Sequence, residues 1–531
     1  MTYRLTEASL RAAIKHLCRY GDTDVFPHLP ELAFFAEQEE DIISELTKLD
    51  LDTYEPLGAV EALTPKSRYG FRVAHQLTAL DILLFLACVV EIGQDIEAKR
   101  QPVENTRAFS YRFAVDASEG QIFRPNHTFK DWLHQQLAII RNDENIQSIV
   151  NTDISDFYPR INFHRLQNLL DEVAPGCGAG RFIMKHLRVI RAKQSFGLPM
   201  GGTASRLLAE LALIDTDQAL VNAGLIATRF VDDFRIFLRS SEHPYDAMGF
   251  LAEQVSINEG LSLSAPKTSV SSRAGFSAYL EKMTTDVADE AESDALEVLT
   301  AEVYFDQEPD QDALEKLKGL NLVEILDREI DAEHWDMGRI KVVFRALKIV
   351  RPPEAIDFIK ANLERMTIFA RDLCLLMEGL EAENPGCFDE LLNQVIEIIR
   401  TPPAASVQLI RTWFVEMLVR GIINIPLQRT KELEVLPSII DKRQLLLIRG
   451  RCGDRNFFRR QKTGLHTFSA FELPALVWGA SCLPQDEYET WLSNSRPSFD
   501  RPLGQLFLRW AAKNRSTLVA KLKPSNLEHP D

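Results

Sequence analysis

Paired cysteines and long apolar runs are both missing from this chain of 531 residues. Its seven cysteines are scattered and no Cys-x-x-Cys pair occurs, so the sequence indicates neither a zinc site nor a disulfide framework. The longest apolar run, Ile82 to Val90, is too short to cross a bilayer and predicts a buried helix. The N-terminus also lacks the charged and then apolar layout of a signal peptide. We therefore expect a cytoplasmic protein that makes no membrane contact.

A surplus of positive charge is missing as well. The formal net charge is −17, which argues against a protein that coats nucleic acid in general. The hydrophobic fraction of 45% and the charged fraction of 26% are those of an ordinary soluble globular protein. The length allows about two to four domains.

One local basic cluster stands out against this acidic background. It surrounds Phe457 and Phe458, and basic grooves with aromatic stacking surfaces are how proteins hold single-stranded nucleic acid. The candidate nucleic-acid contacts are Arg449, Arg451, Arg455, Arg459 and Arg460. The alternative interpretation is a basic helix face that meets acidic neighbours in an oligomer.

Two adjacent acids inside an apolar segment are the most informative feature that is present. Asp232 and Asp233 lie within Arg229 to Leu238, which is otherwise aromatic and β-branched. The segment predicts two short strands with the acids at the bend between them. Neighbouring buried carboxylates are costly without a partner, and Mg²⁺ is a hard ion that prefers oxygen ligands. The alternative is a surface hairpin that carries Asp-Asp in its turn.

Three further segments carry polar residues or glycine in the same half of the chain. Asp153 ends an apolar, strand-like stretch. Leu198 to Gly201 form a glycine-rich turn before an apolar helix, and glycine there lets backbone approach a ligand closely. Lys267 follows a short alternating strand.

In this order the segments resemble the palm of reverse transcriptases. Asp153 corresponds to the family's first acid and Leu198 to Gly201 to its Leu-Pro-x-Gly turn. Phe230 to Asp233 correspond to its aromatic-x-Asp-Asp hairpin and Lys267 to its lysine-bearing segment. The resemblance implies an α/β palm-and-fingers fold and transfer of deoxynucleotides (dNTPs) with two Mg²⁺ ions.

The same resemblance implies a set of metal ligands. Asp153 and Asp232 would bridge both ions, and Asp233 would help hold the ion on the primer side. The backbone carbonyl of Ile154 would add a further oxygen.

Contacts to the nucleotide follow from the same comparison. Tyr158, five residues after Asp153, matches the family's steric gate, where a bulky ring excludes a 2′-hydroxyl; the alternative is an ordinary half-buried aromatic. Met200 and Gly201 would contact nucleotide or template. Met200 replaces the family's usual Gln and cannot donate its amide hydrogen bond, and Phe230 replaces the usual Tyr.

Two cations complete the nucleotide site that the resemblance implies. Lys267 would lie near the leaving pyrophosphate as a point charge or proton donor, with a solvated lysine as the alternative. Arg112, in the strand-like run Phe109 to Phe113, resembles the fingers arginine that grips the triphosphate. A plain ion-pair partner is the alternative for Arg112.

The sequence divides into five predicted parts. These are an N-terminal helical segment (1–59), fingers (60–150), a palm (150–285), an acidic connector (286–315) and an all-α helical-repeat domain of the HEAT type (316–531).

The first part begins with an amphipathic helix, Leu5 to Arg19, which Thr6 caps and Gly21 ends. Helices are also expected at Leu32 to Leu49, Gln76 to Ala98 and Trp132 to Asn142. A loop rich in Pro and Gly is expected between the first two of these helices. In the last part helices follow one another with short Pro or Gly breaks.

The N-terminal turn at Gly21 to Asp24, the Phe-Val-Asp-Asp palm and the helical tail together resemble bacterial abortive-infection (Abi) and related defence-associated reverse transcriptases. That resemblance implies antiphage defence and a homo-oligomer. Some members of this group synthesise single-stranded DNA without a template and attach it to a protein hydroxyl; others use a noncoding RNA. The priming residue is unknown, and the candidates are Tyr3, Tyr20, Tyr54, Tyr69, Tyr245, Tyr279, Tyr304 and Tyr488.

Two other functions are consistent with the sequence. One is a templated reverse transcriptase of a mobile element, which would use an RNA partner. The other is a catalytically idle palm that serves as a scaffold, with the helical tail as a protein-binding module.

Overall fold

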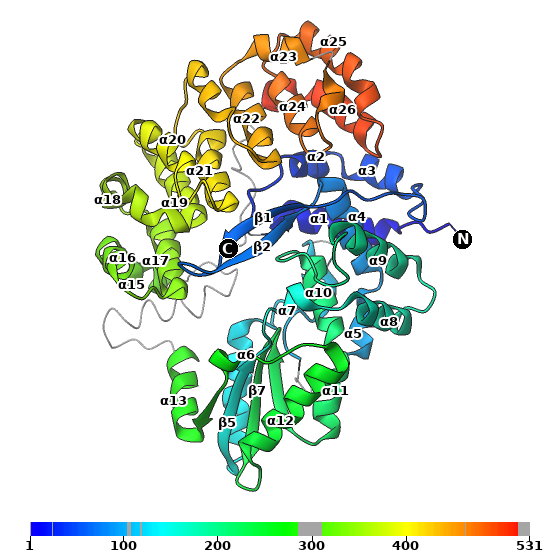
Figure 1. Cartoon of the computed structure of the whole chain (residues 1–531), viewed down its shortest axis with the longest axis vertical. Coiled ribbons are helices and arrows are strands. Elements are labelled where there is room, and N and C mark those ends of the chain that lie inside the picture. The colour runs from blue at the N-terminus through cyan, green and yellow to red at the C-terminus, as the bar shows by residue number, and fades with distance from the viewer. Residues whose placement is uncertain are drawn as a thin grey trace.

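The computed structural model describes residues 2–23, 25–102, 108–116, 119–284, 311–461 and 464–518. Figure 1 shows an α/β part in the lower half, an arc of helices in the upper half, and a β-hairpin between them. No helix within the described ranges is both long and apolar enough to cross a membrane. Most of the predicted acidic connector, including Tyr304, lies outside these ranges.

The first helix begins and ends where its flanking residues allow. In α1 (Glu7–Tyr20) the Thr6 hydroxyl accepts a hydrogen bond from the Ser9 N–H at 3.2 Å, and Gly21 ends the helix with φ 71°. This confirms the predicted helix with its cap and its stop. The single helix predicted next is wrong, because Gln38 divides it into two. These are α2 (Glu31–Glu37) and α3 (Glu39–Leu46).

The described residues of the predicted fingers that precede Ile146 form two hairpins and three helices. The elements are β1 (Val60–Pro65), β2 (Phe71–Gln76), α4 (Ala79–Glu91), α5 (Gly93–Lys99), β3 (Phe113–Asp116), β4 (Gln121–Phe123) and α6 (Phe129–Asn142). The helix predicted from Gln76 is wrong at its start. Gln76 ends β2, and Thr78 caps α4 by accepting a hydrogen bond from the Asp81 N–H. The β1–β2 hairpin was predicted as a loop.

A four-stranded antiparallel sheet forms the centre of the α/β part, in the order β6-β7-β5-β8. Its strands are β5 (Ile146–Asp153), β6 (Ile226–Phe230), β7 (Asp233–Arg239) and β8 (Ser269–Ser272). Ile149 and Phe237 pair across β5 and β7 and pack in one cluster with residues of α6. Their neighbours Val150 and Ile236 belong to the main core. Both faces of the sheet are therefore covered, which fixes the register.

Helices flank this sheet and carry the connections between its strands. They are α7 (Phe157–Arg160), α8 (Phe163–Val173), α9 (Gly178–Ile190), α10 (Thr203–Ala212), α11 (Ile214–Asn222), α12 (Pro244–Gln254) and α13 (Arg273–Thr284). α13 packs beside α6, on the face of the sheet that carries Phe237.

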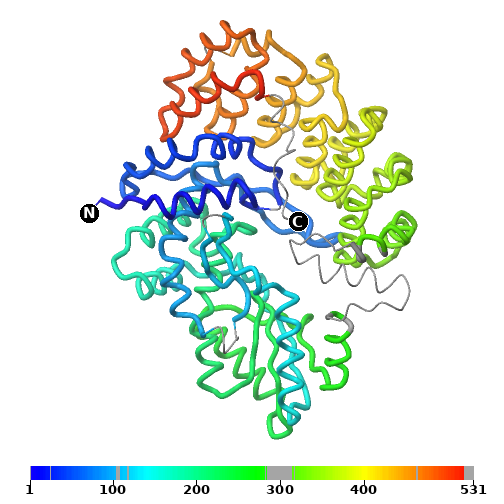
Figure 2. Tube along the Cα trace, turned by 180° about the vertical axis from the view of Figure 1, so that it is seen from behind, coloured from blue at the N-terminus to red at the C-terminus, as the bar shows by residue number. Residues whose placement is uncertain are grey.

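Every regular element described after residue 310 is helical. The helices are α15 (Gln311–Lys318), α16 (Leu322–Asp331), α17 (Met337–Val350), α18 (Glu354–Asn362), α19 (Ala370–Glu383), α20 (Leu392–Arg400), α21 (Gln408–Arg420), α22 (Ile439–Arg451), α23 (Arg455–Gln461), α24 (Leu473–Ala480), α25 (Gln485–Ser495), α26 (Gly504–Lys513) and α27 (Arg515–Leu518). α17, α19, α21, α22 and α24 contact one another in succession. Figure 2 shows from behind that the resulting arc ends beside the N-terminal helices, where the Phe34 and Phe507 rings lie 5.4 Å apart.

The arc of helices also contacts the β1–β2 hairpin. A small apolar cluster, which we call the hairpin cluster, joins Ala62 and Ala74 of the hairpin to Leu409 of α21 and Ile440 of α22, with Phe26 beside them. The Trp413 indole N–H donates a hydrogen bond to the Val25 carbonyl at 2.9 Å. The helical part is therefore packed onto the N-terminal half of the chain and is not merely tethered to it.

Candidate metal centre and nucleotide site

Three carboxylates meet where β5 ends and β7 begins. Antiparallel pairing places Asp153 opposite Asp233, and Asp232 lies in the tight turn between β6 and β7. The Ile154 N–H donates to the Asp232 carbonyl at 3.2 Å, which ties the turn to the end of β5. One carboxylate oxygen from each of the three acids lies within 4.8 Å of the others. Such a set of clustered oxygens suits Mg²⁺ or Mn²⁺.

The electrostatics of the triad also favour a cation. Burial, then the nearby charges of Asp153 and Asp233, raise the pKa of Asp232 to about 7. Burial also raises the pKa of Asp233, although Arg235 opposes that shift. Clustered carboxylates thus hold protons more tightly than they would in water, and a divalent ion would replace those protons.

Lys267 lies beside the three acids. Its Nζ is 2.6 Å from Asp153 Oδ2. The backbone holds it there, because the Ser264 N–H donates to the Asp153 carbonyl at 2.7 Å and Ser155 donates to Ser262 at 2.8 Å. Neither bond uses the carbonyl of Ile154, the predicted backbone ligand. Whether Lys267 acts on pyrophosphate stays a prediction.

Val231 precedes the two turn acids in a rare backbone conformation. Its φ is 56°, in the left-handed region that β-branched residues avoid, at a cost on the order of 1–3 kcal/mol. The Val231 N–H donates to Ser110 Oγ at 2.8 Å, and Arg229 Nη1 donates to the Val231 carbonyl at 2.9 Å. The direction of the Asp232 side chain therefore depends on contacts outside the turn.

Tyr158 lies next to the glycine-rich turn and near the triad. It is half-buried in α7, and the Leu198 N–H donates to its carbonyl at 2.9 Å. Burial, together with Tyr111 and Asp232 among its neighbours, raises the pKa of its phenol well above the ordinary value. This position agrees with a residue that lines the nucleotide site; its action as a steric gate stays a prediction.

The glycine-rich turn packs closely against α7, and its predicted approach to a ligand stays a prediction. Gly197 and Gly201 have φ values of 101° and 96°. A Cβ on Gly197 would lie 2.9 Å from the Pro159 carbonyl, just after Tyr158. Met200 packs against the hairpin cluster. Its side chain therefore contacts that cluster, and the predicted contact of Met200 with a nucleotide stays a prediction.

Arg112 adopts the alternative that the sequence left open. The strand predicted around it is wrong, because residues 110 and 111 form a turn and β3 begins only at Phe113, after Arg112. The guanidinium is 3% exposed, and its Nη2 lies 2.7 Å from Glu97 Oε1. A buried ion pair costs several kcal/mol to break, so a triphosphate would have to compete with Glu97.

The predicted basic cluster does not form one exposed strip, and this corrects the prediction for Arg449. Arg449 is 5% exposed and ion-paired with Glu434 and Asp454, and its guanidinium lies over the Phe457 ring. Arg459 on α23 pairs with Glu487 on α25 at 2.7 Å.

The other three arginines of the cluster differ in exposure. Arg451 is half-buried, whereas Arg455 and Arg460 are exposed. The acidic partners of Arg449 and Arg459 come from this chain, and the alternative of acidic neighbours in an oligomer stays a prediction.

The priming candidates fall into buried and exposed groups. Tyr54 and Tyr488 are buried, and Tyr3 and Tyr20 are half-buried, whereas Tyr69 and Tyr245 are each 82% exposed. Tyr279 on α13 is 44% exposed, and its phenol interacts electrostatically with Arg235, whose Nη1 lies 3.9 Å from Asp233 Oδ1.

The predictions from the sequence did not include the polar and charged residues that are buried next to the β6–β7 turn. Arg229 was noted only as part of the motif, and Ser110, Glu210 and Asp217 were assigned no role. One signal was available for Glu210, since a lone acid inside an apolar helix usually has a buried partner.

No protein-family model matches this sequence, and no curated protein matches it. Among solved structures, apo telomerase from Candida tropicalis is 13% identical with a TM-score of 0.32, over 72% of this chain and 74% of that chain. Telomerase from Candida albicans, in complex with a TWJ fragment of telomeric RNA, is 13% identical with a TM-score of 0.30, over 72% and 70%. Scores this low assign neither a family nor an activity, so what this chain does has to follow from its own site.

Proposed function

We propose that this chain is a metal-dependent nucleotidyltransferase of the reverse-transcriptase type, a DNA polymerase that acts in antiphage defence. The observation that carries the proposal is the meeting of Asp153, Asp232 and Asp233 at the β5–β7 edge of a four-stranded antiparallel sheet. Three further features support the proposal: Lys267 contacts Asp153, Tyr158 interacts electrostatically with Asp232, and the Gly197–Gly201 turn hydrogen-bonds to Tyr158. These segments follow one another along the chain in the order of the palm motifs.

The proposed reaction is the in-line attack of a hydroxyl oxygen on the α-phosphorus of a dNTP. A new P–O bond forms, the bond to the pyrophosphate oxygen breaks, and the hydroxyl loses its proton. Two Mg²⁺ ions held by the three acids would activate the hydroxyl and stabilise the charge on both departing and attacking oxygens. Tyr158 would exclude a 2′-hydroxyl, and Lys267 would neutralise or protonate the leaving pyrophosphate.

We further propose that synthesis is untemplated and starts on a protein hydroxyl, so that the DNA stays attached to the chain. The sequence resemblance to defence-associated enzymes motivates this step. Purified protein would be incubated with Mg²⁺ and each dNTP separately, and the product heated in detergent. A DNA ladder that remains on the protein supports the proposal, and peptide mapping then identifies the linked residue.

Two alternative functions give different results in the same assay. Strict dependence on added RNA supports a templated enzyme with a noncoding or mobile-element RNA. A chain that incorporates no nucleotide under any condition supports the idle scaffold. In cells, Asp232→Ala should abolish protection against phage if the polymerase is responsible, whereas unchanged protection would support the scaffold.

A further inference from the structure

Both backbone polar groups of Val231 are bound by side chains from other segments. Ser110 accepts the Val231 N–H, and Arg229 donates to the Val231 carbonyl. Ser110 reaches this position because its segment runs alongside β6, where the Phe109 N–H donates to the Arg229 carbonyl at 2.9 Å. A strained conformation persists only where its surroundings over-determine it, and these two contacts do so at φ 56°.

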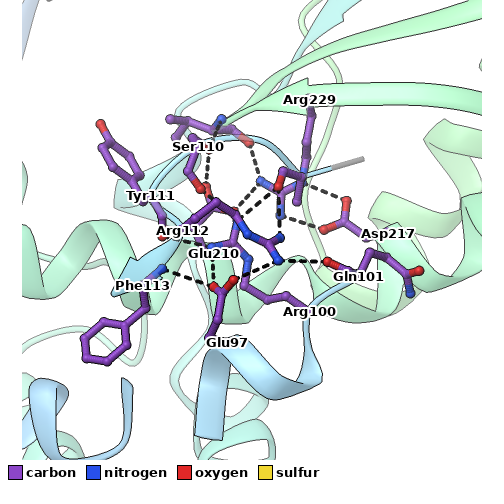
Figure 3. Close-up of polar contacts among 12 residues, drawn as sticks. Glu97, Arg100, Gln101, Ser110, Tyr111, Arg112, Phe113, Glu210, Asp217 and Arg229 are labelled. Atoms are coloured by element: carbon purple, nitrogen blue, oxygen red, sulfur yellow. Dashed lines mark hydrogen bonds and ion pairs between the residues drawn. The ribbon is translucent and has the colours of Figure 1, made fainter. Parts of the chain in front are cut away.

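The two side chains are themselves fixed by a buried ionic network. The Ser110 hydroxyl donates to Glu210 Oε1, and Glu210 Oε2 lies 2.9 Å from Arg229 Nη1. Arg229 also grips Asp217 with two hydrogen bonds of 2.7 Å, through Nε and Nη2. Figure 3 shows Ser110, Glu210, Asp217 and Arg229 pointing toward one another. They come from the segment before β3, from α10, from α11 and from β6.

The network continues away from the turn and is closed to solvent. Arg100 bridges Glu210, at 2.8 Å, to Glu97, at 3.3 Å. Ser110, Glu210 and Arg229 are each at most 1% exposed. Because the charged groups are buried and pair with one another, none of them can leave the network without a large penalty.

The consequence falls on Asp232, the residue that follows Val231. Relaxation of Val231 to an ordinary φ would redirect the chain and carry Asp232 away from Asp153. Glycine is the usual residue for such a turn. This chain has valine there, and Ser110 and Arg229 hold its backbone from outside the turn.

We propose that Ser110, Glu210 and Arg229 are positioning residues for the metal centre, which hold Val231 left-handed so that Asp232 meets Asp153. The proposal rests on the proposed function only in taking the three acids as metal ligands. None of the three positioning residues needs to touch a metal or a nucleotide.

The test measures the affinity of the full chain for Mn²⁺ by electron paramagnetic resonance, with no nucleotide present. Ser110→Ala removes the acceptor of the Val231 N–H and should weaken Mn²⁺ binding about fivefold. Ser495→Ala is the matched control, since Ser495 is equally buried and its hydroxyl donates to the Trp491 carbonyl in α25. It should leave the affinity unchanged.

A second substitution separates positioning from a general effect on folding. Val231→Gly adopts the left-handed conformation without help, so Ser110→Ala should have a much smaller effect in that background. Equal effects in both backgrounds, or wild-type affinity in Ser110→Ala, would overturn the proposal.

The assay also separates this proposal from the proposed function. A wild-type chain that binds Mn²⁺ but incorporates no nucleotide would count against the polymerase and leave the positioning result standing. A wild-type chain that binds no Mn²⁺ would overturn both.

Discussion

At the scale of single residues, Asp232 would couple protonation to the binding of a metal at the proposed centre. Its folded pKa of about 7 is above the ordinary value of 3.8, so the folded chain retains a proton that the unfolded chain releases. The contribution of Asp232 to stability therefore falls as the pH rises from about 4 to about 7 and stays low above that. A divalent ion should restore this stability once the carboxyl is ionised.

We predict that Mg²⁺ stabilises the protein much more at about pH 8 than at about pH 5.5, because the proton and the ion compete for the same carboxylates. Saturating Mg²⁺ should raise the melting temperature by about 2–6 °C at the higher pH. Asp232→Asn should remove most of this difference. An equal shift at both pH values in the wild type would contradict the coupling, and scanning calorimetry would measure it.

The clustering of the three acids could be predicted from the sequence because its signal is local. Two adjacent acids between apolar strands have few structural explanations, and the order of the motifs identified their partner Asp153. The surroundings of Arg112 and Arg449 could not be predicted in this way. Each is buried against an acid distant in sequence or across a turn, and only the packed structure shows that Glu97 or Glu434 is within reach.

At the scale of elements, the glycine-rich turn depends on its approach to α7. Gly197 is the point of closest contact, because its missing side chain leaves room for the Pro159 carbonyl. In the same turn, the Leu198 N–H donates a hydrogen bond to the Tyr158 carbonyl. A change at Gly197 should therefore displace the predicted steric gate.

We predict that Gly197→Ala raises the KM for dNTP about tenfold or more with a smaller effect on kcat, because it separates the turn from Tyr158. Gly224→Ala is the matched control. Gly224 also has a positive φ, 72°, but nothing lies within 4 Å of its added Cβ. Steady-state kinetics of both variants would decide, and equal effects would show that backbone strain alone is responsible.

Element types were predicted best where capping residues and periodicity agree, as in α1. The β1–β2 hairpin was missed because it has little hydrophobic alternation on its own. Its buried apolar positions are Ala62 and Ala74, whose small side chains give a weak signal, and the burial of these two alanines depends on α21 and α22. Tertiary packing decided the structure there, as it often does for strands.

At the scale of the whole molecule, packing links the helical arc to the glycine-rich turn of the candidate site. The hairpin cluster joins the arc to β1 and β2, and Met200 of the glycine-rich turn packs against the same cluster. Arg443 of α22 also pairs with Glu31 of α2. The arc can therefore influence the nucleotide site through packing, although it lies far from it in sequence.

We predict that Leu409→Ala lowers the free energy of unfolding by about 2–4 kcal/mol and also raises the KM for dNTP, because the hairpin cluster supports Met200. Leu476→Ala, in α24, provides the control. Leu476 is as deeply buried but lies outside that cluster, so it should cost similar stability without changing KM. Unchanged KM in Leu409→Ala would argue that the arc and the nucleotide site are independent.

The most direct test of the metal centre is single-turnover incorporation of labelled dNTP by purified protein in Mg²⁺. Asp153→Asn and Asp232→Asn should each reduce the rate by about 10³-fold or more, because the metal-bound oxygens supply several kcal/mol of transition-state stabilisation. Asp156→Asn is the matched control, since Asp156 is exposed and its φ of 48° suits Asn. Full activity in Asp232→Asn, or an equal loss in Asp156→Asn, would contradict the assignment of a catalytic metal site to these acids.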